Sequence, residues 1–193
     1  MTASVSDVEL RSEIHEDITD PLLPDLLYPD RMLWTPRELT DLTSTVASEL
    51  TSSLLTILRY TSPQRWWARL ALTEGVELWL LSWLPGQQTE PHDHGGAAGS
   101  FTVLTGELAE FYRYPGGPIR SQSHDVGSAI GFGAGRAHQV LNLSKGPAAS
   151  VHAYSPPLVP TREYASLADI PAEIPPLPAH RSLADLRKEP VEP

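Results

Sequence analysis

Between Trp66 and about Ser155 the chain is a series of short strand-forming runs separated by glycine and proline. The runs are rich in β-branched, aromatic and other apolar residues: VELWLLSW, SFTVL, ELAEFYRY, SAIGF, HQVLNL and ASVHAY. The segments between them, among them LPGQQ, TGE, YPGGP and GAGR, carry the residues that favour turns. Many short strands at this spacing predict a mainly β domain, either a sandwich or a closed barrel.

A helix is predicted ahead of these strands, in the segment TPRELTDLTSTVASEL. Thr35 suits the N-cap, Pro36 suits the first helical position, and Glu38 completes a capping box. Apolar residues then recur at helical spacing and form one stripe, made of Leu39, Leu42, Val46 and Leu50. We therefore expect N-terminal helices that pack on the outside of the β domain.

Proline and acidic residues dominate the two ends of the chain. The first thirty-odd residues are acidic and interrupted by proline, and the segments SPPLVP, IPAEIPPLPAH and KEPVEP follow the last strand. Such segments do not form long regular elements. We predict four parts: an irregular acidic arm over 1–34, a helical segment over 35–62, a barrel over 63–158 and a proline-rich tail over 159–193.

The overall charge narrows the classes of partner. The formal net charge is −10, from 24 acidic and 14 basic residues, which argues against a nucleic-acid surface or an anionic membrane face. The absence of cysteine excludes disulfides and cysteine-ligated zinc or iron–sulfur sites. The start of the chain lacks a secretory pattern and no run approaches ~20 apolar residues, so we expect a soluble, cytoplasmic protein.

Three histidines are candidates for a metal site. His92 and His94 lie two residues apart in PHDHGGAAGS, so in an extended chain both imidazoles face one side and Asp93 faces the other. His138 begins an apolar strand after the glycine-rich turn GFGAGRA. Imidazole suits zinc, copper, nickel and iron, so the ligands alone leave the metal open. The alternative is that all three are polar loop residues, which is the reading we favour for His15, His124 and His180.

A second polar pattern lies on the last predicted strand. In SVHAYSPP, Ser150, His152 and Tyr154 share one face, and Val151 and Ala153 share the other. Facing inward, the three polar side chains would need partners, and they can supply one another with hydrogen bonds. In the reversed register they would face solvent. The metal candidates nearby favour the inward orientation.

The glycine and histidine spacings resemble the two cupin motifs. Gly86, His92, His94 and Gly106 match the first motif, and Gly127, Gly133, Gly135, His138 and Asn142 match the second. The acidic ligand of the first motif would fall at Ala98 or Gly99, and the nearest acid, Glu107, lies past the Gly106 turn. The resemblance implies a single cupin, a double-stranded β-helix or jelly-roll barrel, with a neutral three-histidine site.

From Trp66 to Pro157 the chain is similar to the cysteine dioxygenase type I family, in a compact bacterial form. The likeness lies in the cupin spacing without an acidic ligand, followed by S-x-H-x-Y-S-P-P. It implies that His92, His94 and His138 hold iron(II), and that Ser150, His152 and Tyr154 form the catalytic triad beside the metal. Trp83 matches a family tryptophan that precedes the first ligands.

The resemblance also implies a substrate. Arg69, in RWWARL, best matches the family's carboxylate-binding arginine, with Arg65 as a rival. The implied reaction is the oxidation of L-cysteine by O2 to cysteine sulfinic acid. One alternative is another small thiol such as 3-mercaptopropionate, although such relatives carry glutamine at the position matched by Arg69. Another is a metal-binding cupin that is non-catalytic or an isomerase.

Two departures from the family concern the pocket. Gly99 stands where mammalian members carry a cysteine crosslinked to the tyrosine, so Tyr154 must act unmodified. Trp67 stands where the family has a tyrosine, two residues before the arginine. We therefore expect one pocket wall to be less polar than in the family.

Overall fold

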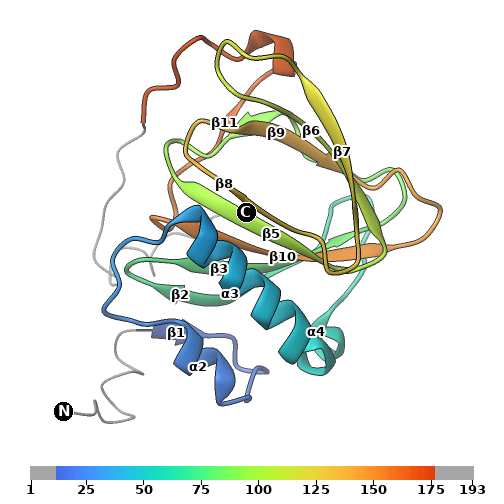
Figure 1. Cartoon of the computed structure of the whole chain (residues 1–193). Coiled ribbons are helices and arrows are strands. Elements are labelled where there is room, and N and C mark those ends of the chain that lie inside the picture. The colour runs from blue at the N-terminus through green and yellow to red at the C-terminus, as the bar shows by residue number, and fades with distance from the viewer. Residues whose placement is uncertain (1–11, 177–193) are drawn as a thin grey trace.

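The structure, a computed structural model, describes residues 12–176 and is mainly β (Figure 1). Two antiparallel sheets face each other. The first has the order β1 (Ser12–Ile14), β2 (Trp67–Thr73), β3 (Glu77–Trp83), β10 (Ala148–Ser155), β5 (Ala98–Thr105) and β8 (Ala129–Phe132). The second has the order β11 (Arg162–Glu163), β4 (His92–Asp93), β9 (Ala137–Leu141), β6 (Glu107–Arg113) and β7 (Arg120–Asp125).

The helices cover the outer face of the first sheet. They are α2 (Leu22–Leu26), α3 (Pro36–Glu49) and α4 (Thr51–Ile57), and α3 lies across β5, β8 and β10 (Figure 1). The predicted start of α3 is confirmed, because Thr35 Oγ1 accepts a hydrogen bond from the Glu38 N–H and Glu38 Oε2 accepts one from the Thr35 N–H. The predicted apolar stripe of this helix is buried.

Two apolar clusters hold the layers together. One lies between the sheets and includes the fully buried rings of Trp79, Trp83, Phe101 and Phe132. The other lies between the first sheet and the helices, and receives the outward-facing Ala149, Val151 and Ala153 of β10. Because side chains alternate along a strand, this packing turns Ser150, His152 and Tyr154 toward the barrel interior, as predicted.

The ends of the barrel region are more regular than predicted. Residues 12–34, expected to be irregular, contain β1, which pairs with β2 and forms the edge of the first sheet, and α2, whose Leu23 is buried against the helical core. After the barrel, β11 pairs with β4, and a 3-10 helix, η1 (Leu167–Asp169), follows. The local sequence of both segments favours regular structure only weakly. They form strands and helices because their apolar side chains are buried and because the sheets offer edges with which they can pair. His180 lies outside the described residues.

Strand β7 was also missed by the sequence patterns. Its sequence, RSQSHD, is polar because β7 is the edge strand of its sheet, and among its residues only His124 is buried. None of the helices in the described part of the chain is long and apolar enough to cross a membrane.

Candidate metal centre and active site

Three histidines converge inside the barrel. Strand β4 pairs with β9 so that His92 lies directly opposite His138, and His94 follows just after β4. One candidate ligand atom from each of the three side chains lies within 4.8 Å of the others. Each pair of imidazole rings has its centroids 4.9–5.0 Å apart. The predicted metal candidates are therefore brought together by the pairing of two short strands.

The hydrogen bonds of these imidazoles leave nitrogens available for a metal. His92 Nδ1 lies 2.7 Å from the carbonyl oxygen of Glu90, and His138 Nδ1 lies 2.7 Å from Glu110 Oε1. Each of these acceptors requires a proton on Nδ1, which leaves the Nε2 lone pair free. Neither buried nitrogen of His94 makes a hydrogen bond of ordinary geometry. A buried nitrogen without a partner fits a metal ligand, because an unsatisfied polar atom is otherwise costly.

Burial keeps two of these side chains uncharged. It is the largest cause that lowers the pKa of His92 to about 3, and the positive charge that His138 would carry lowers it further. Burial and the neighbouring histidines also hold the pKa of His94 well below its ordinary value. Neutral imidazoles are the form that binds metals, so the site accepts a cation without first releasing protons from these two ligands.

A hydrogen-bonded relay runs along the inner face of β10. Ser150 Oγ lies 2.8 Å from His152 Nε2, and His152 Nδ1 lies 3.1 Å from the Tyr154 hydroxyl. Trp83 Nε1 donates to Ser150 Oγ at 2.8 Å. The relay predicted from the alternating sequence is thus formed, with Trp83 of the neighbouring strand β3 at its far end.

Trp83 sets the direction of the relay. An indole N–H can only donate, so Ser150 Oγ is the acceptor of that bond. The Ser150 proton then goes to His152 Nε2, the partner within reach in the described structure, because a buried hydroxyl without an acceptor would be unfavourable. His152 consequently carries its proton on Nδ1 and donates it to Tyr154. The hydroxyl proton of Tyr154 is left to point away from the relay.

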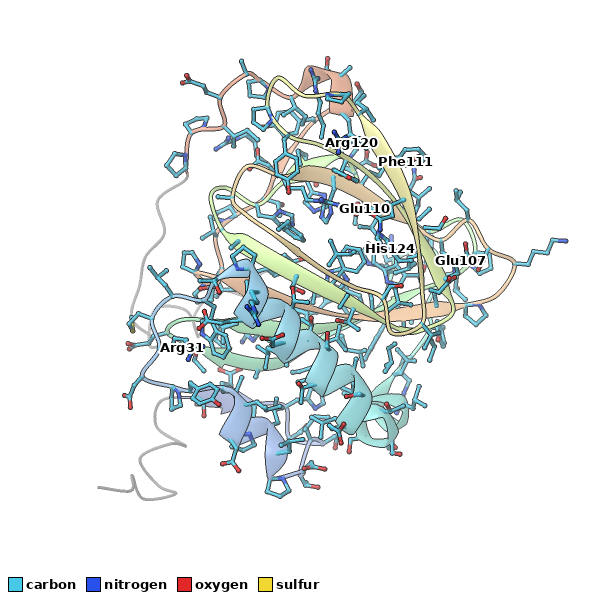
Figure 2. The ribbon with its side chains drawn as sticks, viewed as in Figure 1. Arg31, Glu107, Glu110, Phe111, Arg120 and His124 are labelled. Carbon is cyan, nitrogen blue, oxygen red and sulfur yellow. The ribbon has the colours of Figure 1, made fainter. Side chains whose placement is uncertain are left out.

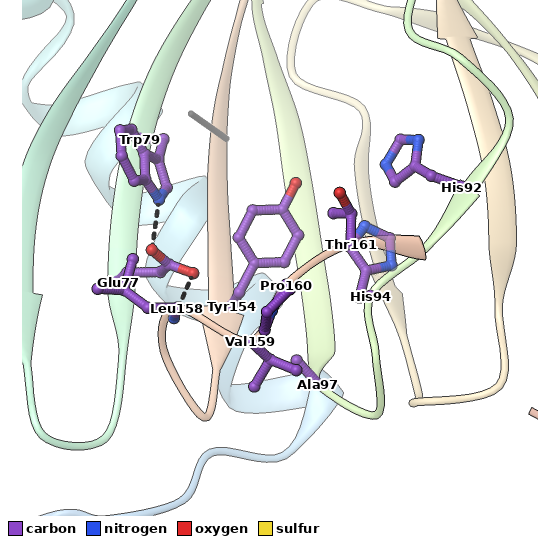
Figure 3. Close-up of a pocket in the computed structure, with 10 residues that line it drawn as sticks. All are labelled: Glu77, Trp79, His92, His94, Ala97, Tyr154, Leu158, Val159, Pro160 and Thr161. Atoms are coloured by element: carbon purple, nitrogen blue, oxygen red, sulfur yellow. Dashed lines mark hydrogen bonds between the residues drawn. The ribbon is translucent and has the colours of Figure 1, made fainter. Parts of the chain in front are cut away.

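Tyr154 brings the relay to a small cavity (Figure 3). The cavity has a volume of about 180 Å³, and its lining includes His92, His94 and Tyr154. Burial, followed by the negative charge of Glu77, raises the pKa of Tyr154, so the side chain stays protonated at neutral pH. Drug-sized ligands occupy about 300–1,000 Å³. This cavity therefore suits a small metabolite, with a hydrogen-bond donor beside the histidines.

The segment that follows β10 closes one side of this cavity. Leu158, Val159, Pro160 and Thr161 line it, and the Leu158 N–H donates to Glu77 Oε1 at 2.9 Å (Figure 3). Glu77 also accepts from Trp79 Nε1 at 2.9 Å, and burial raises the pKa of Glu77 to about 7. This buried carboxylate was missed by sequence reasoning. Its signal was an acid at the start of an apolar strand, two residues before a tryptophan.

A second buried carboxylate lies behind the metal candidates. Glu110 of β6 is fully buried and contacts His138, Arg136 and His124. Burial alone would raise its pKa, but the hydrogen bonds from His124, His138 and Arg136, together with the positive charge that His138 would carry, hold the pKa of Glu110 well below its ordinary value. The prediction that His124 is a loop residue is wrong, since it is buried in β7 with Nε2 3.2 Å from Glu110 Oε2.

The predicted substrate-binding arginine does not face the cavity. Arg69 donates to Glu13 of β1 at 2.9 Å and is not among the residues that line the cavity or its neighbour. Arg65 lines that neighbouring cavity of about 280 Å³, which shares His92 and Thr161 with the first. After burial, the charge of Arg65 is the next largest cause that lowers the pKa of His152. The structure therefore brings Arg65, rather than Arg69, to the histidines and the relay.

Two facing antiparallel sheets around a convergent histidine group define a cupin whose barrel can hold a metal ion. The family model for cysteine dioxygenase type I matches residues 54–166, which is more than half of the chain. The chain belongs to the cysteine dioxygenase type I family. No curated protein matches it.

Several solved structures are similar to the barrel region. TT1209 from Thermus thermophilus is 26% identical over 53% of this chain and 93% of that chain, with a TM-score of 0.47. A protein with a double-stranded β-helix domain from Klebsiella pneumoniae is 18% identical over 57% of this chain and 92% of that chain, with a TM-score of 0.48. Oxalate oxidase in complex with the substrate analogue glycolate is 20% identical over 53% and 56%, with a TM-score of 0.47.

Proposed function

We propose that this protein is an iron(II)-dependent dioxygenase that oxidises a small thiol carboxylate, L-cysteine, to cysteine sulfinic acid. Both atoms of O2 enter the product, so the thiol and O2 balance the sulfinic acid without another reductant. The observation that carries the proposal is the placement of the Tyr154 hydroxyl, at the end of a directed relay, in one small cavity with His92 and His94. Membership of the cysteine dioxygenase type I family supports the same reaction.

The histidine group would hold the iron. His92, His94 and His138 are neutral nitrogen ligands for iron(II), which would supply the redox chemistry that O2 requires. No carboxylate is among these ligands, so the site keeps the full positive charge of the ion and favours an anionic thiolate. The three ligands leave coordination positions open, as in catalytic rather than structural sites.

The remaining groups orient the substrate. Tyr154, held by His152 and Ser150, donates a hydrogen bond toward the reacting end of the thiol, where negative charge develops. Arg65 takes the carboxylate, because a planar guanidinium can form two parallel hydrogen bonds with it. This assignment replaces Arg69, whose guanidinium is paired with Glu13.

The reaction is tested with iron-loaded protein and a panel of thiols. Oxygen uptake and product masses are followed with L-cysteine, cysteamine and 3-mercaptopropionate. We expect uptake with L-cysteine and a product heavier by two oxygen atoms. A protein that binds iron but consumes no oxygen with any of the three thiols would contradict the proposal.

The metal site is tested separately by metal analysis. His138→Ala should lose most of the bound metal because it removes one of three ligands. His15→Ala is the matched control, since His15 lies in the turn after β1, where its Nδ1 accepts from the Asp17 N–H. Full metal retention in His138→Ala would show that the three histidines do not act as one site.

A further inference from the structure

We propose that Glu110 and Arg136 form a pair of opposite charges that sets the metal affinity and the redox potential of the histidine site through His138. The pair lies behind His138, on the side away from the other two histidines' ligand atoms, and neither residue is a candidate ligand. The proposal rests on the metal site of the proposed function, but it is independent of which thiol the protein oxidises.

Glu110 is in direct contact with His138. The carboxylate oxygen Oε1 lies 2.7 Å from Nδ1, and both side chains are buried. An ionised carboxylate only accepts hydrogen bonds, so Nδ1 carries the proton and Nε2 faces the other histidines as a lone pair. A carboxylate acceptor also makes an imidazole a stronger electron donor than a carbonyl acceptor does. His92 has only the Glu90 carbonyl at the same position, so Glu110 distinguishes His138 from it.

Arg136 binds the same carboxylate through two hydrogen bonds. Arg136 Nε lies 3.0 Å from Glu110 Oε1, and its terminal nitrogen Nη2 lies 2.5 Å from Oε2. This is the bidentate arrangement that fixes both oxygens of a carboxylate. The guanidinium carbon also lies 3.6 Å from the ring centroid of Tyr112, the residue of β6 that pairs with His138. These contacts hold the Arg136 guanidinium against Glu110, and its charge offsets that of Glu110 beside His138.

Glu110 supplies a negative charge close to the metal position, which the three histidine ligands lack. The carboxylate ligand of the first cupin motif is replaced by Ala98 or Gly99, so no negative charge touches the metal position directly. Glu110 lies one imidazole away and points into the space between the sheets together with His124 (Figure 2). A negative charge near a metal stabilises its higher oxidation state, and a nearby positive charge has the opposite effect. The two members of the pair should therefore shift the potential in opposite directions.

The experiment measures the apparent dissociation constant for Co²⁺ and the Fe(III)/Fe(II) potential without any thiol. Glu110→Gln should weaken Co²⁺ binding by about 10- to 100-fold and raise the potential. Arg136→Gln should lower the potential, because the carboxylate charge is no longer offset. Glu107→Gln is the matched control, since Glu107 lies on the same strand but is exposed at its start (Figure 2), and it should change neither quantity.

The sign of the shifts separates tuning from simple damage. Loss of structure would weaken metal binding in both variants and would not move the potential in opposite directions. Shifts of the same sign, or no shift in either variant, would overturn the proposal.

If Glu110→Gln alone leaves the buried Arg136 unpaired and fails to fold, the double variant Glu110→Gln/Arg136→Gln removes both charges. This double variant should fold, and it should bind Co²⁺ about 10-fold more weakly than the wild type. A double variant with the wild-type affinity for Co²⁺ would also overturn the proposal. Failure of thiol oxidation alone would leave these readouts unaffected.

Discussion

Tyr154 reaches the cavity as a protonated hydroxyl whose own acceptor position is already filled by His152. Tyr154→Phe removes this donor and leaves the three histidines in place. We expect bound iron to stay at the wild-type level and turnover to fall by about 10²–10³-fold, because a positioned donor to developing negative charge is worth this much. Oxygen uptake coupled to product mass measures the loss.

The exposed Tyr60 provides the control for this change. Tyr60→Phe should oxidise the thiol at the wild-type rate. Equal rates for Tyr154→Phe and the wild type would remove Tyr154 from the proposed reaction, even if the relay on β10 is formed.

Gly99 is constrained by two aromatic rings. A Cβ atom at this position would lie 2.5 Å from Phe132 Cζ and 2.9 Å from Tyr154 Cδ1, both closer than van der Waals contact. We expect Gly99→Cys to lower the free energy of unfolding by about 1–3 kcal/mol through overpacking. Urea denaturation measures this change, and Phe132→Leu in the same chain should recover part of it.

Gly133 offers a matched control for that substitution. A Cβ atom there meets nothing within 4 Å, so Gly133→Cys should leave stability nearly unchanged. If Gly99→Cys is as stable as Gly133→Cys, the rings move aside readily and crowding does not explain the glycine. The crowding also gives a physical reason why the crosslinking cysteine of the mammalian family members is absent here.

The site residues that could be predicted were those encoded by local spacing. His92 and His94, like Ser150, His152 and Tyr154, follow from the two-residue repeat of a strand, which places side chains on a shared face. Glu110 and Glu77 could not be found in this way. Each also depends on a distant partner, since Arg136 lies 26 positions from Glu110 and Leu158 lies 81 positions from Glu77, and only the folded chain brings these residues together.

At the scale of elements, strand β2 shows where the two-residue repeat fails. A register shift lies between Arg69 and Ala71, so Arg69 pairs with Trp79 while Ala71 pairs with Leu78. A bulge of this kind reorients the side chains that follow it. Ala71 joins the cluster under the helices, and Arg69 reaches Glu13 on the added edge strand β1. Neither the bulge nor β1 has a clear sequence signal, so the family match that favoured Arg69 could not reveal its pairing with Glu13.

The positions of Arg69, within β2, and of Arg65, just ahead of that strand, predict different effects for the two arginines. Arg65→Ala should raise the KM for L-cysteine by about 30-fold or more, because losing a charge partner in an enclosed site costs about 2 kcal/mol at least. Arg69→Ala should change the KM much less, since Arg69 pairs with Glu13. Steady-state kinetics with L-cysteine measures both changes.

Cysteamine separates carboxylate binding from general damage to the site. It lacks a carboxylate, so Arg65→Ala should affect its oxidation little. The assignment of Arg65 fails if Arg69→Ala abolishes oxidation of L-cysteine while Arg65→Ala behaves like the wild type. In that case the family match at Arg69 would outweigh the position of its side chain in the structure.

At the scale of the whole molecule, the layered architecture was predictable and the closing segments were not. Strand-forming runs, turn residues and the capping box of α3 each carry a local signal for the barrel and its outer helices. β7, β1 and β11 are short or polar edge strands, and their stability comes from sheet edges that the barrel provides. The cavity depends on one of these edge strands, β11. The segment that leads from β10 to β11 forms one wall of the cavity.

That wall links the stability of the whole barrel to pH through Glu77. Burial raises the pKa of Glu77 from 4.5 to about 7, against the hydrogen bonds from Leu158 and Trp79 and the charge of Arg69, while Tyr154 is the titratable neighbour on β10. Between these two values the folded state holds a proton that the unfolded chain has lost, so the free energy of unfolding falls as pH rises, by about 1.4 kcal/mol per pH unit at most. The loss accumulates to on the order of 3 kcal/mol and is complete above the folded pKa.

Glu77→Gln cannot titrate, so urea denaturation should show it gaining stability relative to the wild type from pH 4.5 to 7.5. Glu74→Gln, on the exposed turn of the same hairpin, should follow the wild type. Parallel curves for Glu77→Gln and the wild type would mean that Glu77 ionises in the folded protein as readily as in the unfolded chain.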